Sequence, residues 1–335
     1  MGIDLPLIWF LIIGFSIMMY VIMDGFDLGI GILFPFIPDR DDRDTMVNTV
    51  APVWDGNETW LVLGGAGLMA AFPLAYAVLL SALYIPALCF LGGLIWRGVS
   101  FEFRFKADEA HKPFWDKAFM LGSYVAAFFQ GVMLGAFLDG YRVVDGVAVG
   151  HVMSWLTPFS LFTGVGVVIA YALLGATWLV LKTEGALQRR VMAMVRPILL
   201  ATLFVIAAVS LWTPLAHPAI AARWFALPNF LFFAPVPALV LVSAWAIVRS
   251  LKDSPHAAPF VWSLILVFLG FSGLVISIWP NILPPDISIW DAAAPPQSLG
   301  FTLVGALLII PFILAYTAWS YYVFRGKVKA GEGYH

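Results

Sequence analysis

The sequence predicts an all-α integral membrane protein, and three observations lead to that fold class. Hydrophobic residues make up 62% of the 335-residue chain and charged residues only 11%, whereas soluble domains carry roughly 25% charged residues. The apolar runs have the length of about 20 residues that a membrane-spanning helix needs. They are far longer than the roughly 9–11 residues of a strand in a membrane barrel. The net charge of −2 gives no indication of nucleic-acid binding.

The apolar runs predict where the helices lie. The first run predicts a helix over residues 7–32. The uncharged run 59–96 is too long for one crossing, and Pro73 divides it into two helices with almost no loop between them. We therefore expect a single polytopic membrane domain over residues 1–335, with nine transmembrane helices at 7–32, 59–73, 75–97, 117–138, 157–181, 192–213, 228–248, 259–280 and 299–324.

The basic residues predict the orientation of these helices. An odd number of spans places the two termini on opposite sides of the membrane. Of the 18 lysines and arginines, only Arg142 and Arg223 fall in segments on one of the two sides. Because lysine and arginine accumulate in cytoplasmic loops, we expect the N-terminus outside and the C-terminus in the cytoplasm. No soluble domain is visible, so function is expected in or beside the membrane.

The first predicted helix carries two carboxylates, Asp24 and Asp27, in the segment YVIMDGFDLGIGILF. They are three residues apart and share one helix face, near the cytoplasmic end of the span. One interpretation is a helix end whose carboxylates meet lipid headgroups; the other is a proton or ion path that opens to the cytoplasm. Gly25 and Gly29 form a small-xxx-small pair that lets another helix pack closely, which favours carboxylates that face protein.

A second polar group precedes the second predicted helix in NTVAPVWDGNETWLVLGGAG and contains Trp54, Asp55, Asn57 and Glu58. Asp55 or Asn57 suits the N-cap of that helix, and acids suit a helix N-terminus. Capping accounts for Asn57 and Glu58, but it explains less well why so many polar groups share a membrane face with Asp24. We predict that Asp24, with Asp55 nearby, lines the cytoplasmic entrance of a proton path and faces another subunit.

A third polar group lies in WRGVSFEFRFKADEAHKPFWDK, at or just beyond the inner ends of the third and fourth predicted helices. It includes Arg97, Glu102, Arg104 and Asp116. A charge run of this kind favours a solvated basic loop that fixes the topology. Arg97 directly follows the apolar LGGLIW, so the alternative is that its side chain extends inward to a carboxylate or a propionate.

Redox chemistry has no visible source in this chain. A membrane haem usually takes a histidine ligand from a helix. The histidines fall in predicted loops or the tail: His111, His151, His217, His256 and His335. Cys89 is the single cysteine, and metal-ligand, phosphate-binding and dinucleotide motifs are missing. We expect no catalytic residue and no metal in this chain.

Several of these motifs resemble subunit II of the cytochrome bd quinol oxidases. They are DGFDLGIG at the end of the first predicted helix, APVWDGNETWL before the second and WRGVSFEFR after the third, with GATWL and AYTAWSYYVFRGKV further along. The resemblance covers nearly the whole chain. The compact length and the segment SIWDAAAPPQSLGFTLVGAL resemble the branch called cyanide-insensitive oxidases.

The resemblance implies a heterodimer in the bacterial inner membrane that reduces oxygen to water with electrons from quinol. Subunit I would carry haems b558, b595 and d and the quinol site, and this chain would ligate no haem. The resemblance also allows a structural quinone or lipid in this subunit and a small single-helix accessory subunit. The residues that it implicates in proton delivery or in support of the haem region are Asp24, Asp27, Trp54, Asp55, Arg97, Glu102 and Asp116.

Two other hypotheses compete with the oxidase. Carboxylates and glycine-rich helices also occur in proton-coupled membrane transporters, but these place charged or unwound segments near the midplane, in paired repeats. Here the charge collects at one face and no inverted repeat is evident. A purely structural membrane subunit is the third hypothesis, and it differs from the oxidase only in giving the carboxylates no part in proton transfer.

Overall fold

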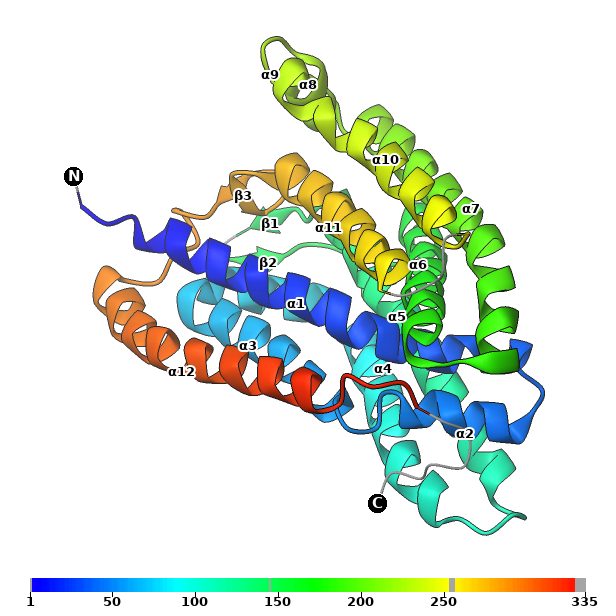
Figure 1. Cartoon of the computed structure of the whole chain (residues 1–335). Helices are drawn as coiled ribbons and strands as arrows, with labels where there is room; N and C mark the ends of the chain where they lie inside the picture. The colour runs from blue at the N-terminus through cyan, green and yellow to red at the C-terminus, as the bar shows by residue number, and fades with distance from the viewer. Residues whose placement is uncertain (1, 145, 253–256, 329–335) are drawn as a thin grey trace.

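Long helices account for most of the computed structural model, which describes residues 2–144, 146–252 and 257–328 (Figure 1). The sequence predictions that concern His256, Lys329 and His335 lie outside the described residues. Two short antiparallel hairpins, β1 (Val143–Val144) with β2 (Val147–Ala148) and β3 (Asn281–Leu283) with β4 (Ile287–Ser288), join helices at the same end of the bundle.

The helices follow one another through short connections. In chain order they are α1 (Leu5–Leu33), the short 3-10 helix η1 (Phe34–Phe36), α2 (Arg40–Asn48), α3 (Trp54–Ala71), α4 (Pro73–Lys106), α5 (Lys112–Asp139), α6 (Pro158–Lys182), α7 (Gly185–Ala216), α8 (Pro218–Phe225), α9 (Asn229–Phe233), α10 (Pro235–Ser250), α11 (Ala258–Ile278) and α12 (Pro296–Val323).

Within the described residues, eight helical segments are long and apolar enough to cross a membrane. They are 5–36, 73–106, 112–139, 158–182, 185–216, 229–250, 258–278 and 296–323. The all-α membrane fold predicted from composition is confirmed at this level, whereas the sequence predicted nine spans. The difference is α3, which has only 18 residues and begins with a polar turn, so its apolar part is short.

Several helices extend further than the apolar runs indicate. Helix α4 continues to Lys106 instead of 97, α5 begins at Lys112 instead of 117, and α7 begins at Gly185 instead of 192. The segment after α1, expected to be a loop, contains α2. The predicted loop that holds Arg97 and Glu102 is therefore wrong, because both residues lie in α4. Hydropathy marks where contact with lipid ends, whereas a helix continues as long as its backbone hydrogen bonds do.

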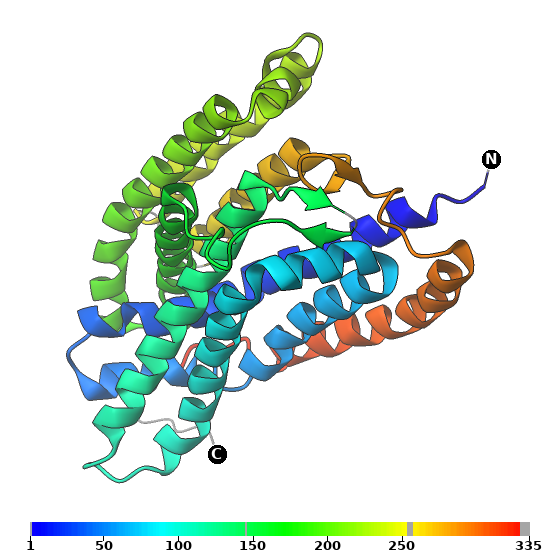
Figure 2. The same ribbon diagram turned by 180° about the vertical axis from the view of Figure 1, so that it is seen from behind.

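Helix α1 is central, with α3, α5, α6 and α12 packed around it (Figures 1 and 2). Its closest contact is with α6. A Cβ on Gly29 would lie 2.8 Å from the backbone nitrogen of Gly175, and a Cβ on Gly25 would lie 2.7 Å from the ring of Tyr171. This is the close helix approach that the small-xxx-small pair predicts, and it places the charged part of α1 inside protein.

Helices α1 and α12 run in the same direction. Near their starts, the indole nitrogen of Trp9 donates a hydrogen bond of 3.0 Å to the carbonyl oxygen of Leu299. Near their ends, the ring centroids of Phe26 and Tyr321 are 6.4 Å apart. The first and last helices therefore begin on the same side of the bundle.

Helices α7 to α10 form an arm that extends away from α1, with α8 and α9 at its tip (Figure 1). Large apolar side chains on this arm are exposed, among them Leu200, Phe204, Leu241 and Trp245. A helix with apolar side chains on its outer surface suits contact with lipid tails. The arm therefore contributes membrane-facing surface, and the polar chemistry lies elsewhere.

Candidate functional site

Three helices bring together a buried ion cluster. Oδ1 of Asp24 on α1 lies 2.7 Å from Nη2 of Arg97 on α4, and Oε1 of Glu58 on α3 lies 2.5 Å from the same nitrogen. The side chains of Asp24 and Arg97 are fully buried, and that of Glu58 is 27% exposed. One arginine nitrogen therefore holds two carboxyl groups, one inside the bundle and one at its edge.

Asp27, the second carboxylate of α1, has a neutral partner. Nδ2 of Asn57 donates to Oδ2 of Asp27 at 2.7 Å, and the hydroxyl of Tyr321 on α12 donates to Oδ1 of Asn57 at 2.8 Å. Asp27 is fully buried and Asn57 is 1% exposed. The two carboxyl groups on one face of α1 thus meet different chemistry, a guanidinium at Asp24 and an amide at Asp27.

Aromatic rings cover the guanidinium of Arg97. Trp54, at the start of α3, stacks on Phe101 with a centroid distance of 4.8 Å. The guanidinium carbon of Arg97 lies 5.8 Å and 5.9 Å from the centroids of these two rings. The rings attract the cation through their π electrons and exclude water from that side of the cluster.

Asp24, Asp27, Glu58 and Arg97, which we name the Arg97 cluster, hold more acid than base. Three carboxyl groups lie near one guanidinium. Among the described residues, both carboxylate oxygens of Asp24, Oδ1 of Asp27, and Nε and Nη1 of Arg97 are buried and have no hydrogen-bond partner, so Asp24 and Arg97 form an ion pair without a hydrogen bond. Buried charges are normally paired and fully hydrogen-bonded, because their desolvation is costly. A cluster this far from saturation is unusual for an ion pair that only stabilises a fold.

A second ion cluster lies further along α4. Nε of Arg104 is 2.7 Å from Asp116, Nη2 of Arg104 is 2.5 Å from Asp44, and Nη1 of Arg43 is 3.1 Å from the second oxygen of Asp116. Arg43 also donates to two backbone carbonyls just after α1. These four residues, which we name the Arg104 cluster, contain two arginines and two aspartates. At its edge Lys112 lies 3.8 Å from Asp44 and 3.0 Å from Glu109, which adds one base and one acid. The cluster connects α2, α4 and α5 to the end of α1.

A row of aromatic rings lies between the two clusters. Phe101 contacts Phe119 at a centroid distance of 4.9 Å, and Phe119 contacts Phe34 at 5.0 Å. The guanidinium carbons of Arg43 and Arg104 lie 5.5 Å and 5.9 Å from the ring of Phe34. Each cluster therefore borders the same apolar row from its own side.

The buried clusters correct three sequence interpretations. Asp24 does not meet lipid headgroups and does not face another subunit, because it is 0% exposed among helices of its own chain. Arg97 and Arg104 do not belong to a solvated loop, since both side chains are buried in α4. Hydropathy penalises each charge separately and cannot show that charges on different helices neutralise one another after packing.

Asp55 and Glu102 lie outside both clusters. Asp55 is exposed in the first turn of α3, and Glu102, with a side chain that is 67% exposed, contacts only Lys106 at 3.7 Å. The structure instead brings Asn57 and Glu58 to the Arg97 cluster, although sequence reasoning assigned them to capping. The sequence did contain a signal for Glu58, because residues three apart share a helix face and Glu58 follows Asp55 at that spacing.

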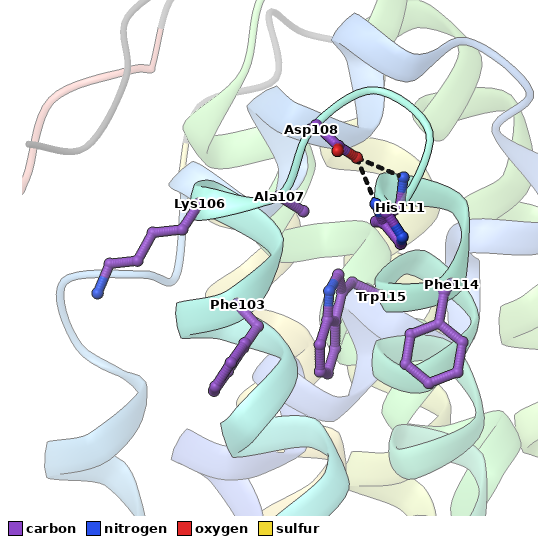
Figure 3. A pocket seen from close by; sticks show the side chains of 7 residues that line it. All are labelled: Phe103, Lys106, Ala107, Asp108, His111, Phe114 and Trp115. Carbon is purple, nitrogen blue, oxygen red and sulfur yellow. Dashed lines mark hydrogen bonds and ion pairs between the residues drawn. The ribbon is translucent and has the colours of Figure 1, made fainter.

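The turn between α4 and α5 forms an open pocket of about 560 Å³, shown in Figure 3. Asp108 accepts hydrogen bonds from the ring Nδ1 of His111 at 2.6 Å and from its backbone nitrogen at 2.9 Å, which hold the pKa of Asp108 below its usual range. The remaining lining residues are Phe103, Lys106, Ala107, Phe114 and Trp115. This mixture of aromatic and charged groups is typical of a membrane–water interface, and the pocket contains none of the predicted site residues.

No group of three His, Cys, Asp or Glu side chains in the described part of the chain is placed to hold a metal ion. The described histidines lie outside the helix interiors. His111 precedes α5, His217 follows α7, and His151 lies in the connection between α5 and α6.

The fold and the two ion clusters define a polytopic α-helical membrane protein whose buried ionisable groups lie where α1, α3, α4 and α5 meet. The chain belongs to the cytochrome bd terminal oxidase subunit II family, whose model matches residues 5–324. Proteins of this family are subunits of a quinol oxidase complex in the bacterial inner membrane, an oxidoreductase whose haems are carried by the partner subunit.

Two curated relatives and one solved structure support this assignment. Cytochrome bd-I ubiquinol oxidase subunit 2 of Escherichia coli (strain K12) is 29% identical over an alignment of 361 positions, which covers 97% of this chain and 95% of that protein. Cytochrome bd ubiquinol oxidase subunit 2 of Bacillus subtilis (strain 168) is 29% identical over an alignment of 343 positions, which covers 97% of this chain and 97% of that protein. The bd oxidase from Geobacillus thermodenitrificans shares the fold, with a TM-score of 0.73 at 18% identity over 94% of this chain and 98% of that chain. The family predicted from motifs is confirmed, and the cyanide-insensitive branch stays a prediction.

Proposed function

We propose that this chain, as subunit II of a cytochrome bd-type quinol oxidase, supports the haem-bearing subunit I and takes up cytoplasmic protons through the Arg97 cluster. The observation that carries the proposal is the excess of carboxyl groups at Asp24, Asp27 and Glu58 over the single guanidinium of Arg97. A stabilising ion pair needs balanced charge, whereas proton transfer needs carboxyl groups that can change protonation state. The unpartnered buried oxygens of this cluster suit the second task.

The predicted residues then take different parts. Asp24 and Asp27 are the buried proton-accepting groups, Arg97 is their counter-ion, and Trp54 covers it. Asp55 is an exposed acid at the start of α3, on the side from which protons would enter.

Asp116 and Glu102 have other surroundings. Asp116 sits between two arginines in the balanced Arg104 cluster, which suits support of the helix packing. Glu102 is exposed on α4, so its part in proton delivery or haem support rests on the family resemblance alone.

We also propose nine membrane crossings, with the N-terminus outside and the C-terminus in the cytoplasm. Parallel first and last helices require an odd number of crossings, and α3 supplies the ninth. It runs back along α1, because Asn57 contacts Asp27 at 2.7 Å while a Cβ on Gly67 would lie 3.1 Å from Ile13. The concentration of lysine and arginine on one side supports the orientation.

The cofactors and partners proposed for the complex follow the family. Haems b558, b595 and d and the quinol site belong to subunit I, and this chain ligates no haem. A structural quinone or lipid in this subunit and a small single-helix accessory subunit complete the proposal. The segment SIWDAAAPPQSLGFTLVGAL supports membership of the cyanide-insensitive branch.

The proposal is tested with Asp24→Asn in the complex of both subunits. Asparagine keeps the size and polarity of the side chain but cannot carry the exchangeable proton. We expect quinol-driven oxygen consumption per haem d to fall about 100-fold, the lower end of the range for loss of an acid–base group, with haem content preserved. Asp41→Asn is the matched control, because Asp41 is exposed in the first turn of α2, and its turnover should stay normal.

The outcome also separates this function from the structural hypothesis. If Asp24 only holds helices together, Asp24→Asn lowers the amount of haem-loaded complex while each remaining complex turns over at the normal rate. Full turnover per haem d in Asp24→Asn therefore removes the proton-uptake proposal and leaves a structural membrane subunit.

A further inference from the structure

We propose that Glu58 is the proton-exchanging carboxyl group that connects the buried Asp24 to the protein surface. This inference rests on the proposed function of the Arg97 cluster in proton uptake and names the residue through which the cluster exchanges protons with its surroundings. In this relay Glu58 stands between Asp55 and Asp24, the two acids that the sequence predicts at the entrance of the path.

Exposure to the surroundings increases from Asp24 to Glu58. Asp24, Asp27 and Arg97 are all 0% exposed, whereas the side chain of Glu58 is 27% exposed. Within the described residues, Glu58 is therefore the member of the cluster that the surroundings can reach. Asp55 lies one turn earlier on α3 and is exposed, so the two acids share one helix face and lead from the surface to the cluster.

The carboxyl groups of Glu58 and Asp24 lie close together. Oε1 of Glu58 and Oδ1 of Asp24 lie 2.5 Å and 2.7 Å from the same arginine nitrogen. They are consequently no more than about 5 Å apart, a gap that one bridging water can span. Nε and Nη1 of Arg97 and Oδ2 of Asp24 are buried polar atoms without a partner in the described chain. Internal water commonly satisfies groups of this kind.

The single positive charge of Arg97 limits how many of its neighbouring carboxyl groups are ionised. One guanidinium neutralises one carboxylate, and a second ionised carboxylate at the same nitrogen would leave an uncompensated charge in a poorly solvated interior. Glu58 and Asp24 therefore share one proton. When the proton moves from Glu58 to Asp24, Glu58 becomes the carboxylate, Asp24 becomes the carboxylic acid, and Arg97 remains protonated beside them. Glu58, Asp24 and Arg97 together are neutral before and after this transfer. Asp24 then passes its proton onward into the protein, and Glu58 regains a proton from the surface, where Asp55 lies, which restores the starting state.

The other polar neighbours suit this task less well. Asp27 is separated from the surface by the amide of Asn57 and the hydroxyl of Tyr321, and an amide side chain holds its protons far more tightly than a carboxylic acid does. Asp55 forms no ion pair or hydrogen bond through its carboxylate within the described chain. Glu58 alone among the described acids contacts Arg97 and is also partly exposed.

The test uses the complex of both subunits with Glu58→Gln, Glu58→Asp and the control Glu109→Gln. Glutamine keeps the length of the side chain and an oxygen for Arg97 but cannot relay a proton. Aspartate keeps the acid on a shorter side chain. Glu109 is a matched control because its side chain is 74% exposed and lies in the turn between α4 and α5. Oxygen consumption per haem d is measured in H2O and in D2O, together with haem content.

We expect Glu58→Gln to lower turnover per haem d about 100-fold, the lower end of the range for loss of an acid–base group, and to raise the ratio of the rates in H2O and D2O. Glu58→Asp should recover part of the turnover and of the normal ratio, and Glu109→Gln should match the unchanged protein. If Glu58→Gln does not assemble, Glu58→Asp decides, because a raised solvent isotope ratio in it supports the relay and an unchanged ratio overturns it.

Three results overturn the relay and can be told apart. Normal turnover and isotope ratio in Glu58→Gln, with slow turnover in Asp24→Asn, remove Glu58 from the path but leave proton uptake by the cluster. Normal turnover per haem d in both variants removes the relay and the proposed function together. Loss of haem content in Glu58→Gln with normal turnover per remaining haem likewise overturns the relay, because it makes Glu58 structural.

Discussion

The two buried arginines of α4, Arg97 and Arg104, have opposite surroundings although they are only about two helical turns apart. Around Arg104, two arginines face two aspartates. Around Arg97, one arginine contacts the carboxyl groups of Asp24 and Glu58, and a third, that of Asp27, lies about one turn further along α1. Several buried polar atoms of this cluster have no partner among the described residues. The first cluster is balanced and the second is not.

This difference indicates different tasks. A balanced, well-bonded cluster has little to gain from binding or losing a proton, so it serves to hold helices together. An unbalanced cluster destabilises the fold, and such ionisable groups within a membrane protein typically mark an ion path or a proton relay. Substitutions in the two clusters should therefore have different effects on stability and on turnover.

The largest effect is expected from Arg97→Ala. It leaves the carboxyl groups of Asp24 and Glu58 without their cation, and removing one partner of a buried pair costs about 3–5 kcal/mol. That is a large part of the total stability of an ordinary domain, and we expect little haem-loaded complex in membranes, measured by haem d absorbance. Combining Arg97→Gln with Asp24→Asn removes charge from both sides and should restore part of the complex. No recovery in this double variant would contradict the charge explanation.

A smaller effect is expected from Asp116→Asn. Arg43 and Arg104 then face an amide instead of a carboxylate, and the loss is about 1–3 kcal/mol for a charged hydrogen-bonding group. The Tm of the purified complex should fall, while oxygen consumption per haem d stays normal. Slow turnover with an unchanged Tm would show that the balanced cluster also moves protons, and the comparison would fail.

Tyr321→Phe is expected to have a weaker effect. It removes the hydroxyl that donates to Asn57 but leaves the bond from Asn57 to Asp27 in place. Loss of one such hydrogen bond costs about 0.5–1.5 kcal/mol, which should appear as a modest decrease in Tm. Tyr322→Phe is the control, since Tyr322 is the exposed neighbour on the same helix. Equal Tm values for the two variants would argue against a contribution from the Tyr321 hydroxyl.

The smallest effect is expected from Glu102→Gln. Its contact with Lys106 is exposed on both sides, and exposed ion pairs contribute about 0–1 kcal/mol. The Tm of the complex should therefore remain within experimental error of the unchanged protein. A decrease as large as that of Asp116→Asn would show that Glu102 becomes buried in the complex, which places this part of α4 at a subunit contact.

The class of protein and the first members of the site could be predicted from the sequence. Because lipid excludes charge and unpaired backbone groups over a fixed thickness, long apolar runs identify membrane-spanning helices without a structure. Asp24 and Asp27 stand out for the same reason, because a carboxylate inside such a run is costly and needs a cause. The glycine spacing at Gly25 and Gly29 likewise predicted the close packing that α1 makes with α6.

The pairing of the charges could not be predicted from the sequence, because it depends on how the helices pack. Glu58 and Arg97 are 39 residues apart in sequence, and Arg43 and Asp116 are 73 apart. Local sequence patterns favoured a helix cap for Glu58 and a solvated loop for Arg97. A short stretch of sequence shows the cost of burying each charge but not the partner that offsets this cost. Burial and pairing depend on how the helices pack, and packing therefore placed Glu58 at the site and left Asp55 at the surface.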